Sequence, residues 1–347
     1  MKKILLSIIA ISFLMSEIQF SGDARFRPRY DIVENGDGSS TSNLYYMYRA
    51  RLNMKADIGE GWFFNTKLGT NSVASMTKIG DSGNQPGILT SYRPSVSFME
   101  LYFGQMKKDW GFWAGAFPLK YNPSLDLHFY DDKLVDIPFA LFNNSSTLGF
   151  AGYKVISGYK FNWFLSVDNN VVEREEFIID ETTIAVDDCD DFTLGIDAFL
   201  NFGSVSFTPR FLTSFGGTED DIYPTTFGGD IILPNIAGFD SGMSYYMSAN
   251  GEEGDEGYYE ADHMRFSLSR SINDGKLKLF YDMARKDDDN VSYLWLSYSH
   301  ICYKGDVGEV IMSPTFRLQT GKNAGTDEFD EDFSRSKIEL TTQIKFK

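Results

Sequence analysis

One segment, residues 43–58, constrains the fold of this chain more than any other. Its even positions are apolar or small from Leu44 onward, whereas most of its odd positions are polar or charged, including Arg49, Arg51 and Lys55. Side chains alternate between two faces along a β-strand, so the segment predicts a strand with one apolar and one polar face. Strands of ordinary globular proteins span about 5–6 residues. A strand this long fits a wall that has lipid on one side and water on the other.

The same period of two recurs along the rest of the chain. The predicted strands lie near residues 20–33, 43–58, 62–71, 95–105, 110–118, 146–156, 158–168, 192–202, 204–214, 223–234, 240–250, 261–272, 275–285, 291–302, 307–319 and 335–347. The pattern is weak at 223–234, and the facing of 95–105 and 110–118 is ambiguous. Short connections alternate with eight long ones, predicted at 34–42, 72–94, 119–145, 169–191, 215–222, 251–260, 286–290 and 320–334. Short turns at one rim and long loops at the other are typical of outer-membrane barrels. We therefore expect an all-β fold, a transmembrane antiparallel β-barrel of sixteen strands with short periplasmic turns and long extracellular loops.

The N-terminus predicts export. Lys2 and Lys3 precede an apolar run over residues 4–15, which is typical of a secretory signal peptide and too short for a spanning helix. We expect a signal peptide over residues 1–16 and a single barrel domain over 17–347. Lysine-led export followed by alternating strands indicates the outer membrane of a Gram-negative cell.

Charge and cysteine content narrow the partners. The formal net charge of −17 argues against nucleic acid as a partner. Many of the acids fall in the predicted long loops, either as solvated loop tips or as groups that bridge divalent cations to a surface glycolipid. Cys189 and Cys302 fall towards opposite ends of the predicted barrel, so we expect no disulfide.

The polar faces of the first three predicted strands share a positive charge. Their basic side chains are Arg25, Arg27, Arg29, Arg49, Arg51, Lys55 and Lys67. Arg or Lys on the lipid face costs about 2–4 kcal/mol at the bilayer midplane. These cations are therefore predicted to line the pore, where they contact passing solutes or pair with inward carboxylates. Asp23, Asp31, Asp57, Glu100 and Asp197 are the possible partners.

On these features the mature chain resembles the general porins of Gram-negative outer membranes. The resemblance implies that the third long loop, 119–145, folds into the barrel and narrows it. The acids of that loop, placed opposite the basic wall, would form a constriction; they are Asp126, Asp131, Asp132 and Asp136. The resemblance also implies a homotrimer. One departure is that Phe346 is penultimate, whereas the family usually ends in an aromatic residue.

The function expected from this pattern is passive diffusion of small hydrophilic solutes and ions across the outer membrane. The basic wall favours anions and the acidic mouths favour cations, so we expect weak ion selectivity. The alternatives are a solute-specific porin for anions or sugars, and a surface adhesin or receptor that binds through its acidic loops.

Enzymatic activity is not expected. The histidines are His128, His263 and His300, and none lies in a recognisable catalytic or zinc motif. We therefore predict no catalytic residues, no metal site and no cofactor, with outer-membrane lipid and the permeating solutes as partners.

Overall fold

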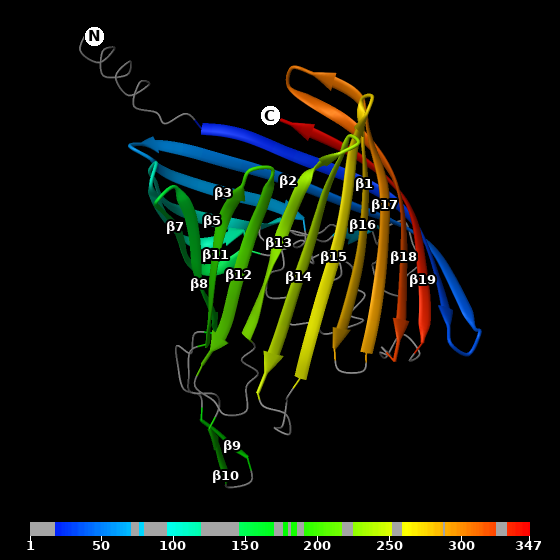
Figure 1. The fold of residues 1–347 in the computed structure, drawn as a ribbon, viewed down its shortest axis with the longest axis horizontal. Helices are drawn as coiled ribbons and strands as arrows, with labels where there is room; N and C mark the ends of the chain where they lie inside the picture. Colours follow the sequence, from blue (N-terminus) through cyan, green and yellow to red (C-terminus); the bar gives the residue numbers. More distant parts are fainter. Residues whose placement is uncertain are drawn as a thin grey trace.

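The described part of the chain forms one closed β-barrel (Figure 1). The computed structural model describes residues 18–70, 76–79, 96–118, 146–169, 176–179, 182–185, 191–216, 225–251, 259–286, 289–323 and 332–347. The wall strands are β1 (Ile18–Asn35), β2 (Ser40–Gly59), β3 (Trp62–Thr70), β5 (Val96–Met106), β6 (Trp110–Pro118), β7 (Ser146–Ile156), β8 (Tyr159–Asn169), β11 (Asp191–Phe202), β12 (Val205–Phe215), β13 (Thr225–Ile236), β14 (Phe239–Asn250), β15 (Tyr259–Ile272), β16 (Gly275–Lys286), β17 (Asp289–Gly305), β18 (Gly308–Lys322) and β19 (Phe333–Phe346). Across these ranges the sixteen strands confirm the predicted number.

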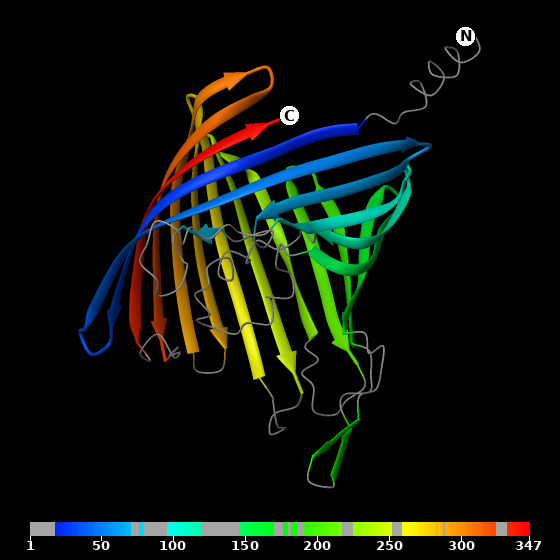
Figure 2. The ribbon, with the colours of Figure 1, turned by 180° about the vertical axis from the view of Figure 1, so that it is seen from behind.

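The first and last strands close the barrel. Each wall strand pairs antiparallel with its neighbours along the chain, and β1 pairs with both β2 and β19. In the seam Gly22 lies opposite Phe346 and Arg29 lies opposite Glu339. Figure 2 shows β1 running beside β19 at this seam. Closure leaves no unpaired edge, which a sheet must achieve in lipid because no water is available to its backbone groups.

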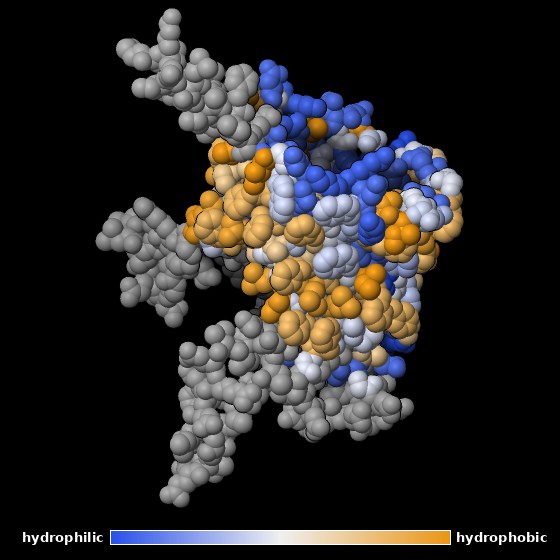
Figure 3. Space-filling model, turned by 90° about the vertical axis from the view of Figure 1, so that its left-hand side faces the viewer, coloured by the Kyte–Doolittle hydropathy of each residue, from blue (hydrophilic) through white to orange (hydrophobic). Residues whose placement is uncertain are grey.

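The two faces of the wall differ as the alternation predicts. On β1 and β2 the side chains of Phe26 and Leu44 are 45% and 55% exposed, whereas Arg29 and Arg49 are each 4% exposed. Figure 3 shows apolar side chains gathered over the outer wall, below a hydrophilic rim. The apolar side chains therefore face outward, and the basic side chains of these strands face the barrel interior.

Two of the three uncertain strands have clear structural explanations. The weakly patterned segment 223–234 forms β13, which pairs with β12 and β14. In β5 the register shifts where Lys67 and Leu68 of β3 pair with Glu100 and Phe98. This bulge inserts an extra residue, Met99, and interrupts the alternation that a sequence pattern can detect.

Two of the eight connections predicted to be long are short in the structure, so those two predictions were wrong. Residues 36–39 join β1 to β2 in a tight turn, where Ser39 N donates to Asp37 Oδ1 at 2.6 Å. Residues 287 and 288 alone separate β16 from β17. Polar residues continue the strands at both places, because backbone pairing does not require apolar side chains beyond the membrane.

Three short strands lie outside the sixteen. β4 (Thr77–Lys78) pairs with β2, and β9 (Glu176–Ile179) pairs with β10 (Thr182–Ala185) in a hairpin, as Figure 1 shows. The strand prediction missed all three, because segments of two to four residues carry too little alternation to detect. Within the described ranges, no helix is long and apolar enough to cross a membrane. The predicted signal peptide lies outside the described residues, as does loop 119–145 with its four acids.

Candidate pore wall

A cluster of basic side chains lies on the inner face at the barrel seam. We call it the basic cluster, and it comprises Arg25, Arg27 and Arg29 of β1, Arg49 and Arg51 of β2, Arg317 of β18, and Arg335 and Lys337 of β19. Strand register brings these four strands side by side, with Arg25 opposite Arg49 and Arg317 opposite Lys337. The cluster therefore exists only because the two ends of the chain meet.

One carboxylate, Glu339, organises the centre of the cluster. Arg29 Nε donates to Glu339 Oε1 at 2.5 Å, and Arg317 Nη2 lies 2.9 Å from Oε2. Arg27 Nη1 lies 3.8 Å from the same Oε2 atom. The Glu339 side chain is fully buried, so this charge depends on its guanidinium partners for compensation.

Two aspartates of β1 hold the rest of the cluster. Asp23 binds Arg51 through Oδ1 at 2.5 Å, and its Oδ2 atom lies 3.2 Å from Arg25 and 3.6 Å from Arg49. Asp31 accepts two hydrogen bonds from Arg335, at 2.9 and 2.6 Å. Bidentate pairing of this kind fixes the plane of the guanidinium.

The basic cluster has an excess of positive charge. Among the side chains that the structure describes here, eight cations lie beside the three carboxylates Asp23, Asp31 and Glu339, so the cations outnumber these carboxylates by five. An inner wall with such an excess attracts anions, and a low-dielectric wall increases the local field.

The cluster has a buried part and an accessible part. The side chains of Arg29, Arg49 and Arg317 are at most 4% exposed, whereas Arg25 and Arg51 are 26% and 18% exposed. Arg25 and Arg51 border a cavity of about 430 Å³ at the short-turn end of the wall. That cavity is also lined by the lysines Lys304, Lys345 and Lys347, and by the carboxylates of Asp306 and Glu309. Cations therefore continue from the accessible arginines to the rim.

Five of the seven predicted pore-lining residues lie together in the structure, and two lie elsewhere. Arg25, Arg27, Arg29, Arg49 and Arg51 come together, but Lys55 and Lys67 do not join them. Lys67 of β3 pairs with Glu100 of β5, and Lys55 is exposed near the short-turn end of β2.

Only some of the carboxylates predicted to pair with the basic wall do so in the structure. Asp23, Asp31 and Glu100 do bind cations of the predicted set or its neighbours. Asp57 instead accepts from Gly59 N at 2.9 Å, and Asp197 accepts from Asn162 Nδ2 at 2.6 Å.

The sequence prediction missed the central carboxylate. Odd positions of β19 face inward with Arg335 and Lys337, so the same alternation places Glu339 on the inner face. That signal was present in the sequence. The contact with Arg29 was not, because the register across the barrel seam is a property of the closed sheet.

A second buried polar group lies on β15 and β16. Arg265 donates to Asp282 through Nε at 2.5 Å and Nη2 at 2.7 Å, and His263 Nε2 lies 3.4 Å from Asp282 Oδ1. The Arg265 guanidinium also covers the Phe280 ring at 5.0 Å. Phe280 in turn packs on Trp295. The charges of Arg265 and Asp282 compensate each other. The rings of Phe280 and Trp295 lie between this group and Arg317 of the basic cluster.

A third inward-facing charged pair lies on β12 and β13. Arg210 Nη2 lies 2.7 Å from Asp230 Oδ2, and Tyr246 Oη donates to Asp230 Oδ1 at 2.9 Å. Among the described residues, no group of three or more His, Cys, Asp or Glu has a metal-binding arrangement. Cys302 is a free, exposed thiol, and Cys189 lies outside the described residues.

Comparisons with known proteins identify the fold. No protein-family model matches the chain, and no curated protein matches its sequence. Among solved structures, the anion-selective porin from Comamonas acidovorans superposes with a TM-score of 0.61 at 13% identity, covering 95% of this chain and 100% of that one. The outer membrane channel DcaP of Acinetobacter baumannii gives 0.58 at 12% identity, covering 96% and 98%. The trimer form of the outer membrane protein OmpT of Vibrio cholerae gives 0.54 at 12% identity, covering 96% and 100%.

Proposed function

We propose that the protein is an outer-membrane porin, through which small hydrophilic solutes and ions diffuse passively. The observation that carries the proposal is the basic cluster on the described inner wall of a closed sixteen-strand barrel. The fold, shared with general and anion-selective porins, supports a channel rather than an enzyme. A charged inner wall serves a pore, since permeating ions meet it directly.

The proposal includes a constriction inside the barrel, with basic side chains on one side and acidic side chains on the other. The accessible arginines Arg25 and Arg51 would form its basic side. The acids of loop 119–145, Asp126, Asp131, Asp132 and Asp136, would form the opposite side. A solute between the two would then experience a transverse field. Support for this arrangement comes from the strong exposure difference within the basic cluster, which makes only part of the cluster available to solutes.

A preference for anions is the second candidate function. The basic cluster favours it, because its cations outnumber its described carboxylates and lie on the same wall as the lysines of the short-turn cavity. In this version the protein passes small carboxylates or phosphates faster than cations of equal size. The net charge of −17 opposes this preference at the loop-bearing mouth, where screening by salt is strongest.

Planar-bilayer recording tests both candidates. Purified protein should give large single-channel steps in 1 M potassium chloride. Under a tenfold salt gradient, the sign of the reversal potential reports whether chloride or potassium moves faster. Correctly folded protein that gives no conductance would overturn the porin proposal and favour a surface-binding barrel.

The assembly and location complete the proposal. We expect a homotrimer in the outer membrane after removal of residues 1–16. The Vibrio cholerae relative in fold is described as a trimer form, which supports the oligomer. Native mass spectrometry of protein extracted from membranes would give both the oligomer mass and the processed N-terminus.

A further inference from the structure

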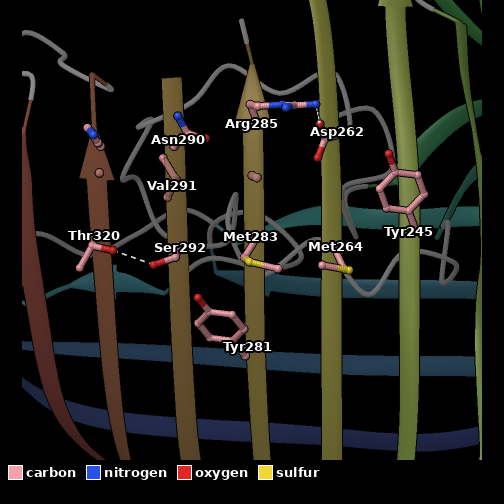
Figure 4. Close-up of a pocket in the computed structure, with 13 residues that line it drawn as sticks. Tyr245, Asp262, Met264, Tyr281, Met283, Arg285, Asn290, Val291, Ser292 and Thr320 are labelled. Atoms are coloured by element: carbon pink, nitrogen blue, oxygen red, sulfur yellow. Dashed lines mark hydrogen bonds and ion pairs between the residues drawn. The ribbon is translucent and has the colours of Figure 1, made fainter. Parts of the chain in front are cut away.

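A groove lies on the outer wall of the barrel, near the ends of β14 to β18 that carry the longer connections (Figure 4). Its volume is about 500 Å³. Met264 and Met283 of the groove each lie two positions from the exposed, outward-facing Phe266 and Tyr281. The groove therefore opens to the membrane side of the wall and not to the pore.

The end of the groove nearest the rim is polar and contains two cations. Arg285 and Lys322 both line it, and the Arg285 side chain is 64% exposed. Arg285 Nη2 lies 2.5 Å from Asp262 Oδ2, as Figure 4 shows. Among the described residues, no carboxylate lies within ion-pair distance of Lys322.

The other end of the groove is mainly apolar. Figure 4 shows Met264, Met283 and Tyr281 further from the rim than Arg285, with Tyr245 beside them on β14. On the neighbouring strands, level with the two methionines, Ser292 and Thr320 share a hydrogen bond of 2.6 Å. Cations thus lie nearest the rim, and hydroxyls and methionines lie side by side in one row further from it.

A second outer cavity continues the groove around the wall. It measures about 310 Å³ and shares Asp262 and Arg285 with the first. Its remaining lining includes Phe227 and Met247, which are 54% and 39% exposed on β13 and β14. Glu260 also lines this second cavity, and the two cavities meet at Arg285 and Asp262.

We propose that this groove binds one lipid molecule with a phosphate-bearing headgroup. The phosphate lies between Arg285 and Lys322, the hydroxyls of Ser292 and Thr320 bond to the polar backbone of the lipid, and acyl chains pack on the methionines. A guanidinium and an ammonium are the side chains that bind phosphate oxygens most strongly. Flexible methionines fill an irregular contact with acyl chains well. Cations near the rim with methionines further from it match the order of a phosphate headgroup and its acyl chains.

The ion pair between Asp262 and Arg285 gives the proposal a prediction of its own. In the described structure its carboxylate occupies one side of Arg285, so a phosphate must compete with it for that guanidinium. Removal of the Asp262 charge should therefore strengthen lipid binding, whereas removal of the cations should weaken it. A site that merely packed against any acyl chain would respond to neither change.

The test measures phosphatidylglycerol on the intact protein in nanodiscs by native mass spectrometry. Arg285→Gln/Lys322→Gln should lower its apparent affinity about fivefold for each cation removed, and Asp262→Asn should raise it. The matched control is Arg270→Gln/Lys108→Gln, which removes two exposed cations near the short-turn rim and should change nothing.

Three results would overturn the proposal. The first is equal retention of phosphatidylglycerol by wild type and by Arg285→Gln/Lys322→Gln. The second is equal retention of phosphatidylcholine and phosphatidylglycerol by the wild type, since the headgroup charge would then be irrelevant. The third is displacement of the lipid by millimolar inorganic phosphate, which would show a site for free phosphate only. All variants should conduct ions as the wild type does. The lipid-site proposal can therefore fail while the porin proposal stands, and the two failures can be told apart.

Discussion

Arg29 Nε donates to Glu339 Oε1 at 2.5 Å, and this contact joins the first strand of the barrel to the last. The two residues are 310 positions apart and lie opposite each other in the register of β1 and β19. Both side chains are almost fully buried. The pair therefore belongs to the closure of the barrel, in addition to its place in the basic cluster.

Loss of the Glu339 charge should destabilise the barrel strongly. Glu339→Gln leaves Arg27, Arg29 and Arg317 without their shared carboxylate, and removal of one partner from a buried ion pair costs about 3–5 kcal/mol. The midpoint of urea-induced unfolding, followed by tryptophan fluorescence in detergent micelles, should fall accordingly.

The control for this variant is Glu309→Gln. Glu309 Oε1 accepts from Lys345 Nζ at 2.9 Å near the short-turn rim, where the two side chains are 26% and 45% exposed. An exposed pair contributes at most about 1 kcal/mol, so the midpoint should hardly move. Equal midpoints for the two variants would contradict a closing role for Glu339.

Ion selectivity should depend on the accessible arginines. Arg25→Gln/Arg51→Gln removes the two most exposed guanidiniums of the Asp23 group, so the reversal potential under a potassium chloride gradient should shift towards potassium. The shift should be larger at 0.01 M than at 1 M salt, because the Debye length falls from about 30 Å to about 3 Å. Arg285→Gln on the outer wall should leave the potential unchanged. A shift of equal size at both salt concentrations would rule out a direct electrostatic effect.

The facing of the basic side chains could be predicted from the sequence because alternation is a local property. Arg29 and Leu44 each lie within a strand whose period of two extends beyond ten residues, and the cost of a cation in lipid then assigns the faces. Alternation is weak over β13, and a different argument favours it: an even number of strands lets the first and last strands pair antiparallel in a closed barrel.

The partners of those side chains could not be predicted so well. Glu339 meets Arg29 only when the sheet closes, and the bulge at Glu100 depends on the register of β5 against β3. The division of the basic cluster into buried and accessible members is also a tertiary property. Arg25 and Arg29 occupy equivalent positions in the alternation, yet their side chains are 26% and 4% exposed.

The seam also depends on a glycine beneath an aromatic ring. A Cβ atom added to Gly22 would lie 2.4 Å from Phe346 Cζ and 2.4 Å from the Arg51 carbonyl oxygen. Gly22→Val should therefore reduce the yield of folded barrel, measured by heat-modifiable mobility on gels, because overpacking costs about 1–3 kcal/mol. Ala24→Val, on the same exposed face of β1, should fold normally. Normal folding of Gly22→Val would show that Phe346 does not need to cover this position.

The group on β15 and β16 allows a test of buried charge that is independent of the pore. Asp282→Asn leaves Arg265 buried without its bidentate partner, and Arg265→Met leaves the Asp282 charge with His263 alone. Each single variant should lower the free energy of unfolding by about 3–5 kcal/mol. The double variant Arg265→Met/Asp282→Asn should lose less than the sum of the two, because neither charge remains uncompensated. Urea unfolding of all four proteins measures this coupling, and additive losses would show that the two side chains stabilise the wall separately.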